Sequence, residues 1–228
     1  MRPEELAKTL DLTILKANLK PAQIEAACLA ARENHFAAVT VGPDRVAQVR
    51  ECMFGSDVKT CAVIGLPHGD YTLAEKLADV TTAVADGADE LDILLNTNAL
   101  RRGSLIQVRD ELLSIVRTAR ARASVRGRGN VLLKAIVDAP LLDEKLTRLA
   151  CKIIVDVECD FATAGSSATI PRLRDVELMR ECLPGEVGVG AGGIANLDAA
   201  EEMIGAGASR LGSEAAGAIV EAFLARKG

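Results

Sequence analysis

Short apolar runs alternate along the whole chain with longer segments whose apolar residues recur every three or four positions. Runs of the first kind predict strands, and segments of the second kind predict helices. The predicted strands span residues 10–15, 37–41, 59–64, 87–96, 131–137, 161–164, 187–190 and 210–212. The predicted helices span residues 21–34, 44–53, 72–86, 104–125, 143–157 and 171–182. A further helix begins at residue 196, before the strand at 210–212, and the last helix follows that strand and ends near residue 226.

Eight strand–helix units in succession predict an α/β fold, the (β/α)8 TIM barrel. The strands of such a barrel are covered by helices outside and filled by side chains inside, which fits the lack of regular polar alternation in these runs. Asp44, Thr169 and Asn196 are predicted helix N-caps, and Pro21 suits a first helical turn. We expect one barrel domain over residues 1–228.

The segment at residues 87–96, GADELDILLN, is unusual because it places two carboxylates, Glu90 and Asp92, within an apolar strand. Alternation along a strand puts Asp92 on the face opposite Leu91 and Ile93. An unpaired carboxylate would be costly to bury there. Asp92 is therefore predicted to be either one partner of a buried ion pair or a group kept for chemistry.

The carboxyl ends of the strands and the loops that follow them hold the active sites of TIM barrels. Lys134 is the one lysine predicted inside a strand, on the same face as Asp138. It is predicted to form a buried ion pair with Asp92 on the neighbouring strand, and the alternative is an amine or proton donor in the site. Polar side chains at or after strand ends are further candidates: Asp11, Thr13, Thr40, Asp138, Thr163, Ser166, Ser167 and Ser213.

Composition narrows the classes of function. The chain has 228 residues, 49% hydrophobic and 26% charged, with a net charge of −5. It has no basic stripe, no Trp and one Tyr, which argues against nucleic acid as a partner. No apolar run reaches membrane-spanning length, and the charged start resembles no signal peptide, so a cytoplasmic protein is expected. The cysteines lack metal or redox spacing and are predicted to be free thiols: Cys28, Cys52, Cys61, Cys151, Cys159 and Cys182.

Several strand–loop motifs together resemble the deoxyribose-phosphate aldolase family. They are LDLTILKA at 10–17, FAAVTVGP at 36–43, AVIGLPHG at 62–69, GADELDILLN at 87–96, LLKAIVDAPLL at 132–142 and GAGGI at 190–194. They follow the family order over nearly the whole chain. The resemblance implies a class I aldolase-type barrel that cleaves 2-deoxyribose 5-phosphate into glyceraldehyde 3-phosphate and acetaldehyde.

The resemblance also implies catalytic groups, and two of them are missing. The family has a Schiff-base lysine on the sixth strand and a second lysine on the seventh, where this sequence has Thr163 and Gly190. An imine requires a primary amine, which threonine cannot supply. The aspartate that moves protons in the family corresponds to Asp92 and is retained.

The loops that would meet a phosphate are altered as well. Gly192 and Gly193 precede a predicted helix and could offer backbone N–H groups to an anion. The loop after the eighth strand reads Gly212-Ser213-Glu214, and a carboxylate there would repel phosphate. The sequence leaves phosphate recognition open.

These observations predict a set of site residues. Asp92, Lys134, Asp138 and Asp11 are the predicted catalytic groups. Because burial raises the pKa of a carboxylic acid, Asp92 suits general acid catalysis. The predicted substrate-binding residues are Thr13, Thr40, Leu66, Thr163, Ser166, Gly192, Gly193 and Ser213. No metal site and no cofactor are predicted.

Three hypotheses for function follow. The first is an enzyme repurposed from the aldolase scaffold, a lyase, cyclase or isomerase of a specialised biosynthetic pathway that acts on a small polar or carbonyl-bearing molecule by acid/base chemistry. The second is a non-catalytic barrel that binds a ligand or stabilises a partner. The third is a true deoxyribose-phosphate aldolase that uses Lys134 or Lys16. A small-molecule substrate and a homodimer are the expected partners.

Overall fold

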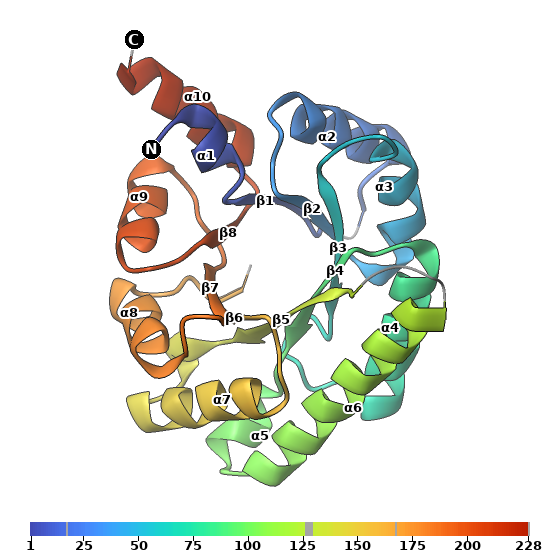
Figure 1. Cartoon of the computed structure of the whole chain (residues 1–228), viewed down its shortest axis with the longest axis vertical. Helices are drawn as coiled ribbons and strands as arrows, with labels where there is room; N and C mark the ends of the chain where they lie inside the picture. The colour runs from blue at the N-terminus through green and yellow to red at the C-terminus, as the bar shows by residue number, and fades with distance from the viewer. Residues whose placement is uncertain (17, 126–129, 167, 228) are drawn as a thin grey trace.

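Eight parallel strands close into a barrel in the computed structural model, which describes residues 1–16, 18–125, 130–166 and 168–227. The strands follow one another around the barrel in chain order, and β1 pairs with β8 to complete it (Figure 1). They are β1 (Leu10–Ile14), β2 (Ala38–Val41), β3 (Lys59–Ile64), β4 (Glu90–Leu94), β5 (Leu132–Val137), β6 (Phe161–Ala164), β7 (Gly188–Ala191) and β8 (Arg210–Ser213). The predicted TIM barrel is confirmed.

Helices surround the barrel and pack their apolar faces on the outer side of the strands (Figure 1). The helices are α1 (Pro3–Ala7), α2 (Pro21–Glu33), α3 (Val46–Cys52), α4 (Leu73–Asp86), α5 (Thr97–Arg101), α6 (Leu105–Val125), α7 (Glu144–Asp156), α8 (Leu173–Cys182), α9 (Leu197–Gly205) and α10 (Ala216–Lys227). Two 3-10 turns, η1 (Pro43–Arg45) and η2 (Ala139–Leu141), follow β2 and β5. The short helices α1 and α5 were not expected from the sequence.

The helix caps agree only in part with the sequence-based expectations. Asn196 caps α9 by accepting a hydrogen bond from Ala199 N at 2.9 Å, as predicted. Asp44 is not a cap, because it lies inside the 3-10 turn η1 and pairs with Arg45. Thr169 is not a cap either, because its hydroxyl is used by Asp138 in the loop before α8.

A buried lysine fixes the loop after β3. Lys76 of α4 is fully buried, and its Nζ donates to Gly69 O at 2.7 Å, to Leu94 O at 3.0 Å and to Glu111 Oε1 at 2.6 Å. Gly69 has a φ of +69°, and a Cβ there would lie 2.1 Å from Leu95 O. The loop therefore packs tightly against the end of β4, beside the mouth of the barrel.

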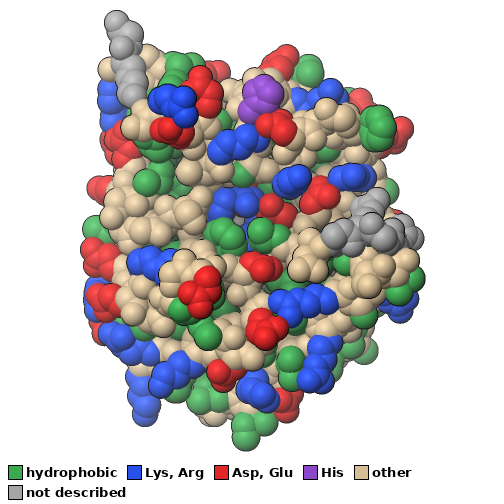
Figure 2. Space-filling model, in the orientation of Figure 1, with side chains coloured by type: hydrophobic (Ala, Val, Ile, Leu, Met, Phe, Trp, Pro, Cys, Tyr) green, Lys and Arg blue, Asp and Glu red, His purple; other side chains and the backbone are tan. Residues whose placement is uncertain are grey.

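The surface carries charges of both signs. On the face shown in Figure 2, Lys and Arg side chains alternate with Asp and Glu side chains, and hydrophobic side chains lie between them. Among the described residues, no helix has the length and apolar character needed to span a membrane.

Candidate active site

A cavity of about 310 Å³ opens at the carboxyl ends of the strands. Apolar side chains from several strand–loop segments form much of its wall, including Leu15, Leu66, Ile136 and Ile170. Polar groups from β1, β2, β4, β5 and β6 form its inner surface. The predicted residues that line it are Asp11, Thr13, Thr40, Leu66, Asp92, Lys134, Thr163, Ser166, Gly192, Gly193 and Ser213.

One predicted catalytic residue has a different place. Asp138 is buried but does not appear among the described residues that line the cavity. Its Oδ2 accepts a hydrogen bond from Thr97 Oγ1 at 3.1 Å, and its Oδ1 accepts one from Thr169 Oγ1. Asp138 directly follows β5, and its side chain links Thr97 at the start of α5 to the loop before α8. Ser167 lies outside the described residues.

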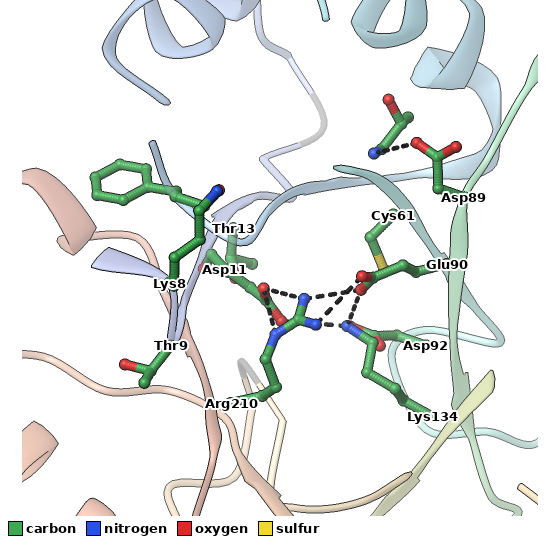
Figure 3. Close-up of polar contacts among 12 residues, drawn as sticks. Lys8, Thr9, Asp11, Thr13, Cys61, Asp89, Glu90, Asp92, Lys134 and Arg210 are labelled. Carbon is green, nitrogen blue, oxygen red and sulfur yellow. Dashed lines mark hydrogen bonds and ion pairs between the residues drawn. The ribbon is translucent and has the colours of Figure 1, made fainter. Parts of the chain in front are cut away.

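Lys134 belongs to a buried charge cluster, which we define as Asp11, Glu90, Asp92, Lys134 and Arg210 (Figure 3). Asp92 and Lys134 are register partners on β4 and β5, and Lys134 Nζ lies 3.0 Å from Asp92 Oδ1. The predicted ion pair is confirmed. The same ammonium lies 3.1 Å from Asp11 Oδ2 and 2.9 Å from Glu90 Oε2.

Arg210 of β8 provides the second cation of the charge cluster. Its guanidinium lies between Asp11 and Glu90 in Figure 3 and donates to both carboxylates. Arg210 Nη2 is 2.8 Å from Glu90 Oε2, and Arg210 Nε is 3.0 Å from Asp11 Oδ1. Three carboxyl groups thus face two cations, so one of the three can carry a proton without leaving either cation unpaired.

The surroundings shift the pKa values of the charge cluster in different directions. Burial raises the pKa of Asp92 above its usual value; Lys134 opposes this shift, while Asp11 and Glu90 add to it. Burial acts in the same sense on Glu90, but Lys134 and Arg210 outweigh it and lower the pKa of Glu90. Burial lowers the pKa of Lys134, but the attraction of the carboxylates is larger and holds it well above its usual value. Asp92 is therefore the carboxyl group best suited to carry a proton.

Two polar atoms beside the cavity have unused hydrogen-bonding capacity. Thr40 Oγ1 is buried and has no hydrogen-bond partner in the structure. Asp92 Oδ1 is close to the ammonium of Lys134 but makes no hydrogen bond of good geometry. Buried polar groups are normally satisfied, and exceptions often mark places where a ligand or water binds. Thr40 and Asp92 both line the cavity, so a ligand can use both.

The wall formed by β6 and β7 is closely packed around small residues. Thr163 and Gly190 are register partners, and a Cβ at Gly190 would lie 2.7 Å from Thr163 Oγ1. At Gly188 a Cβ would lie 2.2 Å from the ring of Phe161. Neither strand carries a lysine within its described residues, and Lys134 is the one lysine among the described residues that line the cavity.

The mouth of the cavity beside β8 has its own ion pair and hydrogen bonds. Glu214 lines the cavity, and its Oε2 lies 3.2 Å from Lys16 Nζ. Ser213 Oγ donates to Ile194 O at 2.5 Å and accepts from Ala215 N at 2.9 Å. The hydroxyl of Ser213 is therefore already used in holding the loop.

Sequence reasoning missed the role of Arg210 and gave none to Glu90. Arg210 stands two positions before Gly212, which pairs with Asp11 across the β1–β8 junction. Strand alternation places Arg210 on the inner face, next to a carboxylate, once the barrel is closed. Glu90 shares the face of Asp92 by the same rule. Strand parity combined with barrel closure would have found both residues.

The chain offers ion pairs rather than a metal site at this position. Within the part of the chain that the structure describes, no group of three or more His, Cys, Asp and Glu side chains could hold a metal ion. The carboxylates of the charge cluster are held instead by Lys134 and Arg210.

Comparison with known proteins places the chain in one family, although no family model matches it. A deoxyribose-phosphate aldolase of Brevibacillus brevis is 37% identical over 216 residues, which cover 93% of this chain and 94% of the relative. One from Streptococcus pneumoniae is 35% identical over 97% of this chain and 98% of the relative.

Solved structures agree with the sequence comparison. An aldolase superimposes with a TM-score of 0.88 at 31% identity, covering 98% of this chain and 97% of its own. A deoxyribose phosphate aldolase from Aeropyrum pernix, described as having a unique tetrameric structure, gives a TM-score of 0.89 at 26% identity over 99% of this chain and 93% of its own. The chain belongs to the deoxyribose-phosphate aldolase family.

Proposed function

We propose that this chain is an enzyme that works without the Schiff-base lysine implied by its family resemblance. It acts on a small polar or carbonyl-bearing molecule by acid/base chemistry, as a lyase, cyclase or isomerase of a specialised pathway. The observation that carries this proposal is Asp92: a buried carboxyl group with a raised pKa that lines the cavity and has an oxygen without a well-formed hydrogen bond.

The proposed chemistry follows from the charge cluster. Protonated Asp92 donates its proton to a carbonyl or hydroxyl oxygen of the substrate, and the resulting carboxylate is stabilised by the ammonium of Lys134, 3.0 Å away. Asp11 holds Lys134 in place through a 3.1 Å hydrogen bond. Asp92 can then take a proton back from the substrate, as general acid–base catalysis requires.

The polar groups around Asp92 would bind and orient the substrate. We assign this role to Thr40, whose buried hydroxyl has no hydrogen-bond partner among the described residues, and to Thr13, Thr163 and Ser166; Gly192 and Gly193 line the cavity beside them. Leu66 and Ser213 shape the cavity beside them. Asp138 contributes indirectly, since its hydrogen bonds join Thr97 of α5 to the loop that carries Thr169.

An imine mechanism through Lys134 is disfavoured by its surroundings. Imine formation needs a neutral amine, and the usual pKa of lysine is already about 10.4. Three carboxylates raise the pKa of Lys134 further, so its amine stays protonated. Treatment with borohydride in the presence of acetaldehyde or 2-deoxyribose 5-phosphate should therefore leave the intact mass unchanged. A stoichiometric adduct that disappears in Lys134→Leu would contradict this proposal and support aldolase chemistry.

A second experiment tests the acid/base role directly. A panel of small carbonyl compounds is incubated with the protein in D2O, and NMR measures deuterium incorporation or conversion. We expect Asp92→Asn to lower the rate about 10²- to 10⁴-fold. Asp156→Asn, at an exposed position of α7, is the matched control and should keep the rate. Equal rates in Asp92→Asn and the parent protein would show that Asp92 is not the acid/base group.

Assembly and location complete the proposal. We propose a homodimer; self-association is supported by the deoxyribose phosphate aldolase of Aeropyrum pernix, which is a tetramer. Light scattering after size-exclusion chromatography would test it, and a monomeric mass would contradict it. A cytoplasmic location is supported by the six cysteines, all of which are free.

A further inference from the structure

The charges around the cavity leave little to attract an anion. Inside the cavity, both cations of the charge cluster are already in contact with carboxylates. At the mouth, Lys16 is paired with Glu214, and both side chains are more than half exposed. An arriving phosphate would compete with Glu214 for Lys16 and would be repelled by the Glu214 carboxylate.

Several hydrogen-bond donors beside Glu214 are used within the protein. The hydroxyl of Ser213 donates a hydrogen bond to Ile194 O. The backbone N–H of Gly192 bonds to Ala164 O at 2.9 Å, and the N–H of Ile194 bonds to Gly212 O at 3.0 Å. These loops come directly before α9 and α10, yet the donors named here point into the fold instead of toward the cavity.

The remaining wall favours a ligand with an apolar part. Ile170, with a relative exposure of 69%, and Leu66 line the cavity with Ile194. The unpartnered hydroxyl of Thr40 and the carboxyl group of Asp92 lie among these apolar groups as hydrogen-bonding positions. Pockets of this kind bind a mostly apolar ligand and orient it through a few polar contacts.

We propose that this cavity takes uncharged molecules that combine an apolar part with a hydroxyl or carbonyl group, and that Glu214 excludes phosphate esters from it. This rests on the proposed function only in taking the cavity as the substrate site. Glu214 is a specificity-determining residue with no part in the proton transfer. Its carboxylate neutralises Lys16 at the mouth and repels a second anion.

Calorimetric titration at low ionic strength tests this proposal, with inorganic phosphate and 2-deoxyribose 5-phosphate as the probes. The parent protein should show no saturable binding in the millimolar range. Glu214→Gln keeps the shape of the side chain and frees Lys16, so it should bind 2-deoxyribose 5-phosphate at least about tenfold more tightly. Glu186→Gln, at an exposed position of another loop, is the matched control and should show no gain.

A double variant checks whether any gain in phosphate binding by Glu214→Gln comes from Lys16. Adding Lys16→Met to Glu214→Gln should remove the new binding, because the freed ammonium is its source. Saturable phosphate binding by the parent protein, no gain in Glu214→Gln, or a gain that survives Lys16→Met would each overturn the proposal. Since the titration measures binding alone, its outcome is independent of whether Asp92→Asn loses turnover.

Discussion

Lys134 is the residue of the charge cluster that contacts all three carboxyl groups. It is 1% exposed and contacts three carboxylates from two other strands. A buried ammonium is compatible with a stable fold only while its partners are present, because the ion pairs offset the cost of removing its charge from water. The same contacts that stabilise the ammonium keep it from acting as a nucleophile. At the scale of the residue, structural and chemical roles are therefore coupled.

Replacing Lys134 by Met should destabilise the fold strongly. The change leaves Asp11, Glu90 and Asp92 buried with Arg210 as the one remaining cation of the charge cluster. We expect the free energy of unfolding to fall by about 3–5 kcal/mol, the usual cost of breaking a buried ion pair. Chemical denaturation measures it, with the exposed Lys152→Met of α7 as control. A loss below about 1 kcal/mol would indicate that the carboxylates simply become protonated.

Replacing Asp92 by Asn should have the opposite effect on stability. The folded-state pKa of Asp92 is raised, so folding favours its protonated form. The stability that this form contributes is lost as pH rises through that pKa. Asn mimics the protonated form at every pH. Thermal melting should show Asp92→Asn equal to or more stable than the parent at neutral pH, with the difference shrinking toward acid. A variant that is less stable at neutral pH would mean that the ion pair with Lys134 outweighs the cost of burial.

The neighbouring strands β6 and β7 depend on each other through Thr163 and Gly190. A side chain at position 190 would overlap Thr163 Oγ1, so the threonine fills the space that a β7 side chain would need. The same relation holds between Gly188 and Phe161. At the scale of the element, this part of the barrel accepts one side chain from each pair of positions, and here both come from β6.

A pair of substitutions tests this packing. Gly190→Ala alone should cost about 1–3 kcal/mol, as overpacking of a close-packed interior usually does. Adding Thr163→Ala removes the atom that the new Cβ would meet at 2.7 Å, so the double variant should recover most of the loss. Denaturation of the parent, both single variants and the double variant gives the coupling energy. Additive effects would show that the two positions do not share this space.

The sequence predicted elements better than side-chain partners. Periodicity identified all eight strands, because a buried strand and an amphipathic helix differ in their spacing of apolar residues. Asp44 was wrong as a cap because it lies inside η1, and Thr169 because its hydroxyl bonds to Asp138 and α8 begins only at Leu173. The contact between Asp11 and Arg210 joins residues 199 positions apart. It becomes visible only once the barrel is closed, which local patterns do not show.

At the scale of the whole molecule, the charge cluster joins the first and last strands to the middle of the chain. Arg210 of β8 bonds to Asp11 of β1 and to Glu90 of β4, across the interior of the barrel. Lys134 of β5 adds a second link to the same two carboxylates. The two halves of the barrel are therefore held together by ionic contacts as well as by backbone pairing, so the protonation of one member should affect global stability.

Glu90 is the member of the charge cluster on which the effect of protonation on global stability can be tested. Its folded-state pKa is lowered, so its contribution to stability is present above the ordinary value of about 4.3 and is lost as pH falls through the folded pKa. The parent protein should therefore lose stability on acidification in this range, and Glu90→Gln should lose less, starting from a lower stability at neutral pH. Urea denaturation between neutral pH and the acid range measures both. Parallel pH profiles would exclude Glu90 as a source of the acid sensitivity.

The carboxyl groups inside the barrel also restrict how imine chemistry could be acquired by mutation. An amine introduced at position 163 would share the cavity with Asp92, and nearby carboxylates favour the ammonium form. A lysine introduced alone at position 163 would therefore stay protonated and unreactive. It would become a nucleophile only after a carboxylate was removed or a second cation was supplied. The path toward an aldolase thus has an order: a change in electrostatics comes first, and the nucleophile gains its reactivity afterwards.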